Sequence, residues 1–133
     1  MAVCEILSVG TEILLGDILN TNSKYLSVQL AKLGISVLRH TTVGDNPERL
    51  KAALREASER CDLIITSGGL GPTYDDLTKE TVSEFFGRKL VRNDEILLDI
   101  ENYFAESGKT MTENNKKQGC RANAKAFGTP LVQ

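Results

Sequence analysis

The chain has 133 residues, of which 41% are hydrophobic and 26% are charged, and its formal net charge is −2. These values are typical of a single globular domain and exclude a largely disordered chain. The 16 basic and 18 acidic residues include no basic block, so nucleic acid is excluded as the main partner.

The cysteines and the hydropathy pattern indicate the compartment. The three cysteines have no C-x-x-C spacing, and the single histidine offers no partner for a zinc site, so we expect reduced thiols. No apolar run approaches the roughly 18 residues of a membrane span. The first residues also lack the basic and apolar regions of a signal peptide. We therefore expect a soluble cytoplasmic protein that makes no membrane contact.

The first half of the chain is predicted to alternate strands and helices. Apolar runs rich in Val, Ile and Leu predict strands at residues 3–9, 35–43 and 63–67. Thr21 or Asn22 is expected to cap a helix through residue 33. Asn46 and Pro47 predict the next helix start, because proline at the first helical position loses no hydrogen bond.

The second half is predicted to be mostly helical. Helices are expected at residues 78–86, with Thr78 as the cap, and from Asn93 as the cap to Gly108. A short extended piece at residues 89–91 joins them. Thr112 is expected to cap one more short helix through residue 117.

Strands that alternate with helices imply right-handed crossovers and a three-layer α/β/α fold with a mostly parallel sheet. Ligands of such sheets bind at the carboxyl ends of the strands. Polar turns follow all three predicted strands, at residues 10–12, 44–46 and 68–78. We expect these turns to gather at one edge of the sheet.

The turn after the third predicted strand carries Gly68, Gly69 and Gly71. Without a Cβ, this backbone can adopt positive φ and turn several N–H groups toward an anion. The helix start at Thr78 would also favour negative charge. One interpretation is therefore a phosphate site. The other is an ordinary strand-to-helix turn, because short glycine motifs occur often.

Asp75 and Asp76 follow the glycines. Two carboxylates repel a phosphate unless a cation intervenes, so the pair suggests a divalent ion such as Mg²⁺ with oxygen ligands. The alternative is that both carboxylates are solvated caps of the turn. Tyr74 either stacks on a nucleobase or stands exposed without a role.

Several segments resemble the N-terminal domain of the competence-damage inducible (CinA) proteins. They lie within residues 4 to 118, at residues 8–12, 20–22, 43–46, 66–78 and 112–118. The wider superfamily is the molybdopterin-binding domain, whose pattern Gly-Gly-x-Gly followed by Asp-x-Thr is similar to Gly68, Gly69, Gly71, Asp76 and Thr78. The resemblance implies the three-layer fold and a metal-dependent pyrophosphatase acting on ADP-ribose.

The resemblance also implies roles for individual residues. Asp45 and Asp76 match two aspartates implicated in metal binding or catalysis, and the three glycines match the phosphate loop. Glu12 matches an acidic residue of the molybdenum-insertion proteins, and Thr21 and Asn22 match positions in the family motif. The alternatives stay open: a local backbone contact for Glu12, helix capping for Thr21 and Asn22, and a place just outside a helix for Asp45.

The resemblance stops after residue 118, and residues 119–133 show no apolar periodicity. Relatives carry an Asn-Pro-Val-Gly-Thr segment near the ligand. One choice among the synonymous codons for residues 128–133 would encode these same five residues in another reading frame. We therefore expect a domain at residues 1–118 and a divergent tail produced by a frame slip or a truncation. A missing last strand would expose a sheet edge and favour a homo-oligomer.

Three functional hypotheses follow. The first is metal-dependent hydrolysis of a nucleotide-sugar pyrophosphate, with ADP-ribose as the expected substrate. The second is binding of a pterin phosphate with adenylyl transfer, as in molybdenum cofactor synthesis. The third is a truncated, non-catalytic nucleotide-binding remnant.

Overall fold

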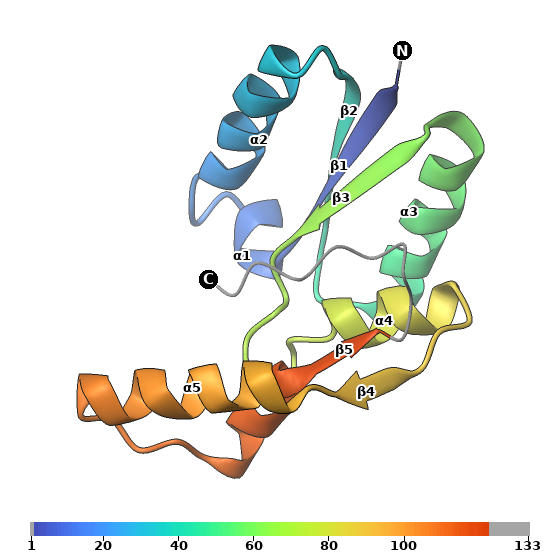
Figure 1. The fold of residues 1–133 in the computed structure, drawn as a ribbon. Coiled ribbons are helices and arrows are strands. Elements are labelled where there is room, and N and C mark those ends of the chain that lie inside the picture. Colours follow the sequence, from blue (N-terminus) through green and yellow to red (C-terminus); the bar gives the residue numbers. More distant parts are fainter. Residues whose placement is uncertain (1, 123–133) are drawn as a thin grey trace. The chain divides into compact units, whose positions relative to one another are not determined.

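The structure is a computed structural model and describes residues 2–122, so the expected tail lies outside the described residues from residue 123 onward. The chain divides into unit 1, Met1–Gly69, and unit 2, Leu70–Gln133. The positions of the chain's parts relative to one another are not determined, and each unit is described by itself (Figure 1).

Unit 1 contains a parallel sheet with the strand order β2-β1-β3. The strands are β1 (Val3–Val9), β2 (Ser36–Val43) and β3 (Leu63–Ser67). The helices α2 (Thr21–Lys32) and α3 (Pro47–Arg60) lie on opposite faces of this sheet (Figure 1). The predicted α/β/α layers and parallel strands are therefore confirmed.

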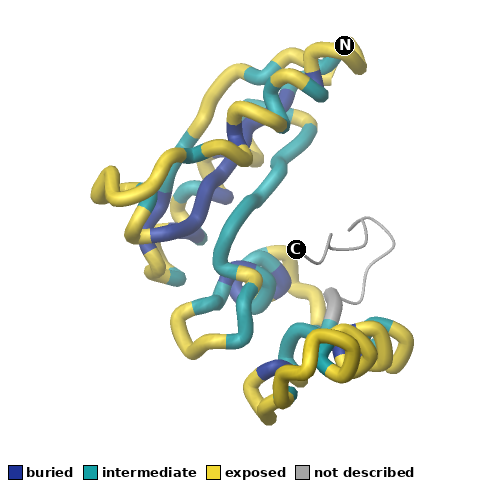
Figure 2. Tube along the Cα trace, turned by 90° about the vertical axis from the view of Figure 1, so that its left-hand side faces the viewer, coloured by how far each residue is buried: buried dark blue, intermediate teal, exposed yellow. Residues whose placement is uncertain are grey.

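The central strand β1 carries the core of unit 1, because helices cover both of its faces. Cys4 and Ile6 pack with Leu30 of α2. On α3, Leu50 and Leu54 are buried, as their helical spacing predicts. Figure 2 shows the buried stretch running through the middle of this unit.

The helix caps of unit 1 agree with the prediction at α3 and differ at α2. Asn46 caps α3, and its Oδ1 accepts the Arg49 amide at 3.0 Å. α2 is capped by Asn20, which accepts the Ser23 amide at 3.2 Å, so the prediction of Thr21 or Asn22 as the cap was wrong. The reason is tertiary, because Asn20 Nδ2 also donates to Ser8 Oγ of β1 at 2.8 Å.

Unit 2 combines helices with a small antiparallel pair of strands. Its elements are α4 (Thr78–Phe85), β4 (Leu90–Arg92), α5 (Asp94–Ser107), the 3₁₀ helix η1 (Glu113–Gly119) and β5 (Cys120–Ala122). β4 pairs with β5, which the sequence did not predict. Asn93 caps α5 and Thr112 precedes η1, as predicted. Thr78 is not the cap of α4: Leu77 holds that place without a side-chain hydrogen bond, and Thr78 is the first helical residue.

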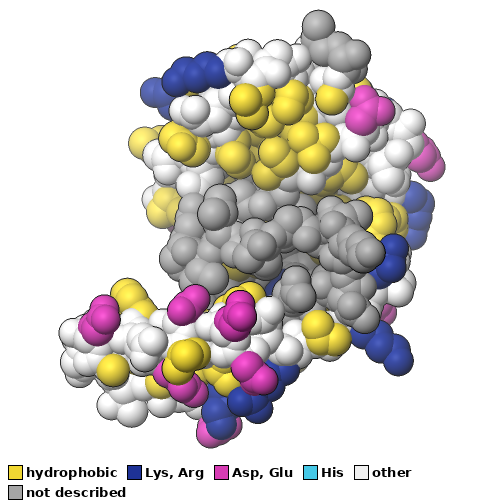
Figure 3. Space-filling view, in the orientation of Figure 1, with side chains coloured by type: hydrophobic (Ala, Val, Ile, Leu, Met, Phe, Trp, Pro, Cys, Tyr) yellow, Lys and Arg dark blue, Asp and Glu magenta, His cyan; other side chains and the backbone are white. Residues whose placement is uncertain are grey.

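Two further features concern the charge of α5 and the hydropathy of the helices. Exposed acidic side chains gather over α5, so an anionic ligand would be repelled from that helix (Figure 3). Within residues 2–122, no helix is long and apolar enough to cross a bilayer.

Candidate functional site

The turns after β1 and β2 are joined at the carboxyl edge of the unit 1 sheet. The Thr11 amide donates to Asp45 Oδ2 at 3.3 Å, and the Asp45 amide donates to Thr11 Oγ1 at 3.1 Å. Thr11 begins the short helix α1 (Thr11–Leu14), which the sequence had indicated only as a polar turn. The two turns therefore meet as expected, and the exposed carboxylate of Asp45 is held by Thr11.

Glu12 lies at the same edge. A Cβ placed on Gly10 would come within 2.7 Å of Glu12 Oε1, so the carboxylate lies against the backbone at the end of β1. Glu12 is exposed and stands in the first turn of α1. Its position agrees both with ligand contact and with the local backbone contact that the sequence left open.

The end of β3 is tied to the first turn of α2. Asn22 Nδ2 donates to Ser67 Oγ at 3.1 Å, one residue before the glycine turn. Thr21 is exposed beside it and makes no side-chain hydrogen bond to another residue in the described part of the chain. Both residues therefore lie near the turn after β3, while Asn20 does the capping.

The glycine turn begins with two left-handed residues. Gly68 has φ +86° and Gly69 has φ +68°. A Cβ on Gly68 would lie 2.2 Å from the carbonyl oxygen of Val9, so only glycine allows β3 to leave the sheet this close to β1. Within residues 2–122, the amides of Gly68 and Gly69 donate no hydrogen bond, which leaves them available to an anion.

In unit 2, the same loop continues as a tight turn around Asp76. Asp76 Oδ2 accepts the Thr73 amide at 2.9 Å and the Thr73 hydroxyl at 2.5 Å. A Cβ on Gly71 would lie 2.6 Å from the same oxygen, so the carboxylate occupies the space that any other residue at position 71 would fill. Gly71 and Asp76, both predicted site residues, are thus in direct contact.

The loop also sets the charge of Asp76. Partial burial alone would raise its pKa, but hydrogen bonds from the Thr73 hydroxyl, the Thr73 amide and the Gly71 amide oppose this, as does the charge of Lys117. The net result is a pKa of Asp76 below its ordinary value. The carboxylate is therefore ionised at neutral pH.

Two lysines near this loop were missed by the sequence analysis. Lys117 Nζ donates to the carbonyl oxygen of Thr73 at 2.7 Å and to that of Asp76. Lys79 Nζ donates to the carbonyl oxygen of Lys117, and burial, together with the Lys117 charge, lowers the pKa of Lys79. The available signal was that Lys117 lies in the family-like segment 112–118, to which no role had been given.

Thr78 and Tyr74 differ sharply in exposure. Thr78 is 2% exposed, and its Oγ1 has no hydrogen-bond partner among the described residues, an arrangement that leaves a buried polar atom unsatisfied. The Tyr74 side chain is 89% exposed and is available for stacking. Asp75 is exposed as well.

The acids do not form a ready-made metal cage. Among residues 2–122, no group of three or more His, Cys, Asp or Glu side chains is placed to hold a metal ion. Asp45 accepts the Thr11 amide through Oδ2, and Asp76 accepts the Thr73 amide and hydroxyl through Oδ2. Such carboxylates fit the mode in which Mg²⁺ is held by one or two carboxylates, waters and substrate phosphates.

Comparisons with known proteins show the family of the chain. The sequence model of the family described as "Probable molybdopterin binding domain" matches residues 5–130. A "CinA-like protein" of Dictyoglomus thermophilum is 64% identical over 115 residues, which cover 86% of this chain and 28% of that protein. A "Putative competence-damage inducible protein" of Bacillus subtilis is 59% identical over 114 residues, with 86% and 27% covered. The chain thus spans less than a third of these relatives.

Solved structures give the same answer for the fold. The CinA protein of Thermoplasma acidophilum, described as having unknown function, has a TM-score of 0.80 and 32% identity, and the match covers 92% of this chain and 71% of that one. The molybdopterin biosynthesis enzyme MoaB of Thermus thermophilus has a TM-score of 0.61 and 31% identity, with 63% and 54% covered.

Proposed function

Since this chain belongs to the molybdopterin-binding domain family, in its CinA branch, we propose that it hydrolyses the pyrophosphate bond of a nucleotide sugar, with ADP-ribose as the substrate. The reaction adds water across the diphosphate and releases AMP and ribose 5-phosphate. The proposal concerns only the part of the relatives that this chain spans.

One observation carries the proposal. The loop from β3 to α4 opens with two left-handed glycines whose amides are unpaired within residues 2–122. Amides in this state favour an anionic oxygen, because a diphosphate would replace the hydrogen bonds that they lack.

The other predicted residues would serve the two ends of the substrate. We assign Tyr74 to stacking on the adenine, because its ring is exposed and an aromatic face accepts any base. Asn22 and Thr21 would contact the ligand from the first turn of α2. Glu12 would accept a hydrogen bond from a ribose hydroxyl.

We further propose that Asp45 and Asp76 hold one or two divalent ions such as Mg²⁺. The bound ion would neutralise phosphate oxygens and lower the pKa of a water molecule. The ionised state of Asp76 at neutral pH suits this role. We give no role in the reaction to His40, the single histidine of the chain, because its Nε2 is paired with Ser27 Oγ at 2.8 Å.

A second candidate is binding of a molybdopterin-type pterin phosphate with adenylyl transfer. The likeness to MoaB of Thermus thermophilus favours it, since that protein is described as a molybdopterin biosynthesis enzyme. The same glycine loop would hold the pterin phosphate. The two candidates differ in the substrate and share the residues that grip its phosphate.

The test compares substrates and variants side by side. The protein is incubated with Mg²⁺ and either ADP-ribose or an adenylated pterin, and AMP is quantified by chromatography. D76N is expected to lose about 100-fold or more of the activity of the parent. D75N is the matched control, because Asp75 is adjacent but exposed, and it should keep its activity.

Four outcomes are decisive. Hydrolysis of ADP-ribose that needs Mg²⁺ and Asp76 supports the first candidate, and turnover of the pterin alone supports the second. D76N activity within about tenfold of the parent contradicts the role of Asp76. Neither substrate bound nor turned over would indicate the non-catalytic remnant.

A further inference from the structure

Lys117 contacts the loop of unit 2 that runs from Leu70 to Asp76 at two points. Its Nζ donates to the carbonyl oxygens of Thr73, at 2.7 Å, and of Asp76. Glu80 Oε1 lies 4.0 Å away, and the Lys117 side chain is 29% exposed. An ammonium group has three donors, so most of the hydrogen-bonding capacity of Lys117 is spent on this one loop.

The two residues that Lys117 contacts are the same two that brace the loop from within. Asp76 Oδ2 accepts both the amide and the hydroxyl of Thr73, and it occupies the space above Gly71. The side chain of Asp76 therefore fixes the inside of the turn while Lys117 fixes its carbonyl groups. Each contact limits the positions that the other allows.

Lys117 is itself presented by a well-anchored element. Asn115 of η1 is buried, and its Nδ2 donates to Gln118 Oε1 at 3.2 Å. Gln118 Nε2 reaches the Leu70 carbonyl at 3.5 Å, and Lys79 donates to the carbonyl oxygen of Lys117. η1 is thus attached to the start of the loop, through Gln118 and Leu70, and to its end, through Lys117 and Asp76.

We propose that Lys117 is a positioning residue for Asp76, which holds the Asp76 carboxylate in its place over Gly71 through the two carbonyl contacts. This inference rests on the proposed function, in which the Asp76 carboxylate holds a divalent ion. Lys117 acts through the loop, and no contact between Lys117 and the substrate is needed.

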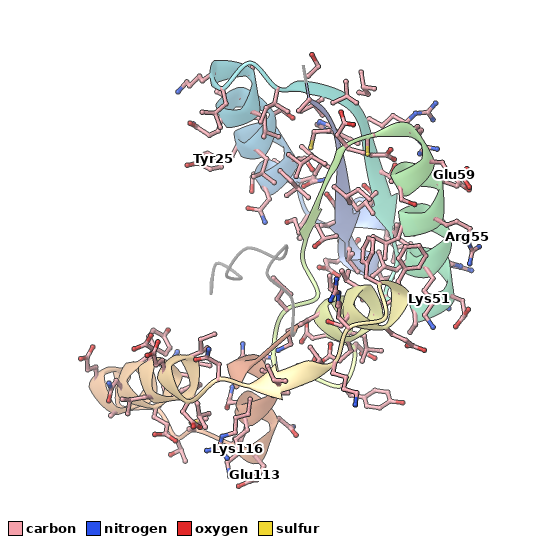
Figure 4. All side chains as sticks on the ribbon, turned by 45° about the vertical axis from the view of Figure 1, so that its right-hand side comes forward. Tyr25, Lys51, Arg55, Glu59, Glu113 and Lys116 are labelled. Atoms are coloured by element: carbon pink, nitrogen blue, oxygen red, sulfur yellow. The ribbon has the colours of Figure 1, made fainter. Side chains whose placement is uncertain are left out.

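The neighbouring lysine supplies a matched control. Lys116 is 55% exposed and pairs with Glu113 at 2.9 Å (Figure 4). The variants K117M, K117R and K116M are compared in ADP-ribose hydrolysis. K117M is expected to lower kcat about tenfold or more and to change KM less than about threefold, because misplacement of an acting group lowers turnover. K117R should recover most of the loss, because guanidinium also donates to two acceptors, and K116M should match the parent.

A double-mutant cycle shows whether Lys117 acts through Asp76. In a D76N background, K117M should add less than about a twofold further loss, because the residue that it positions has already been altered. Losses that multiply, with K117M as costly in D76N as in the parent, would overturn the proposal.

A substrate-free measurement separates this inference from the proposed function. Hydrogen exchange of the Thr73 amide, which donates to Asp76, is followed by NMR in the protein without ligand. K117M should accelerate this exchange about fivefold or more, while β1 amides and the K116M variant stay unchanged. K117Q, which keeps an uncharged NH₂ donor group, replaces K117M if β1 loses protection.

Hydrogen exchange tests the positioning role of Lys117, and turnover tests the proposed hydrolysis, so a failure of one can be told from a failure of the other. Faster Thr73 exchange in a protein that hydrolyses neither substrate leaves the positioning of Asp76 standing and removes the proposed function. Parental exchange and parental turnover in K117M remove the positioning role and leave the proposed function intact.

Discussion

Thr11 and Asp45 exchange two hydrogen bonds across the carboxyl edge of the unit 1 sheet. The amide of each residue donates to the side chain of the other, at 3.3 Å and 3.1 Å. Thr11 follows β1 and Asp45 follows β2, so this reciprocal pair joins two turns that are 34 residues apart in sequence. The Asp45 carboxylate is therefore held by the backbone amide of Thr11, and the Thr11 hydroxyl holds the backbone of Asp45.

Replacing Thr11 with Val should weaken this junction. Val keeps the shape of Thr but leaves the Asp45 amide without its acceptor, and the free energy of unfolding should fall by about 0.5 to 1.5 kcal/mol. If Asp45 acts as proposed, ADP-ribose hydrolysis should fall as well. Urea unfolding and the hydrolysis assay measure the two effects. T11S retains the hydroxyl, and equal behaviour of T11V and T11S would contradict the prediction.

Removing Arg60 should be far more costly to the fold. Glu5 is 1% exposed, and its two oxygens accept from Arg60 Nε at 3.0 Å and from the Arg60 terminal nitrogen at 2.7 Å. R60M leaves this buried carboxylate without its cation, so the free energy of unfolding should fall by about 3 kcal/mol. Urea unfolding provides the measurement.

Glu56 provides the control for this ion pair. It lies 3.7 Å from Arg60 and its side chain is 67% exposed, so E56Q should change the free energy of unfolding by less than about 0.5 kcal/mol. A loss in R60M no larger than that in E56Q would show that Glu5 does not depend on Arg60.

Much of unit 1 was predictable because its signals are local. β1 and β3 are short runs rich in Val, Ile and Leu, each is followed by a glycine, and both have the predicted bounds. Asn46 followed by Pro47 marks the start of α3 without tertiary help. The gathering of Glu12 and Asp45 at one edge followed from the parallel topology alone.

What escaped prediction depends on distant partners. Three successive residues, Asn20 to Asn22, can all cap a helix, and the choice of Asn20 rests on Ser8 of β1. β5 pairs with β4 from a distant part of the sequence and has no strong pattern of its own. Lys117 reaches carbonyls 41 and 44 residues away, and a lysine carries no local sign of such a contact.

The assignment of the α2 cap can be tested directly. N20A removes both the acceptor for the Ser23 amide and the donor to Ser8, and it should lower the free energy of unfolding by about 1 to 2 kcal/mol. T21A should change it by less than about 0.5 kcal/mol, because Thr21 is exposed and is not the cap. Thermal or urea unfolding distinguishes them, and a larger loss in T21A than in N20A would show that Thr21 is the cap.

Gly68 provides the sharpest test of the phosphate loop, because a second glycine isolates its steric part. Gly68 and Gly16 have similar left-handed φ values, +86° and +81°. A Cβ on Gly16 would meet nothing within 4 Å, whereas one on Gly68 would lie 2.2 Å from the Val9 carbonyl oxygen. G16A should therefore cost about 1 kcal/mol from the left-handed conformation alone. G68A should cost at least about 1 to 3 kcal/mol more, because backbone atoms must move to relieve the overlap.

The same pair of variants tests ligand binding. In G68A protein that remains folded, moving the turn displaces the unpaired Gly68 and Gly69 amides, so the affinity for ADP-ribose should fall in G68A and stay unchanged in G16A. Equal losses of stability in the two variants would show that the turn after β3 does not approach β1 as closely as described.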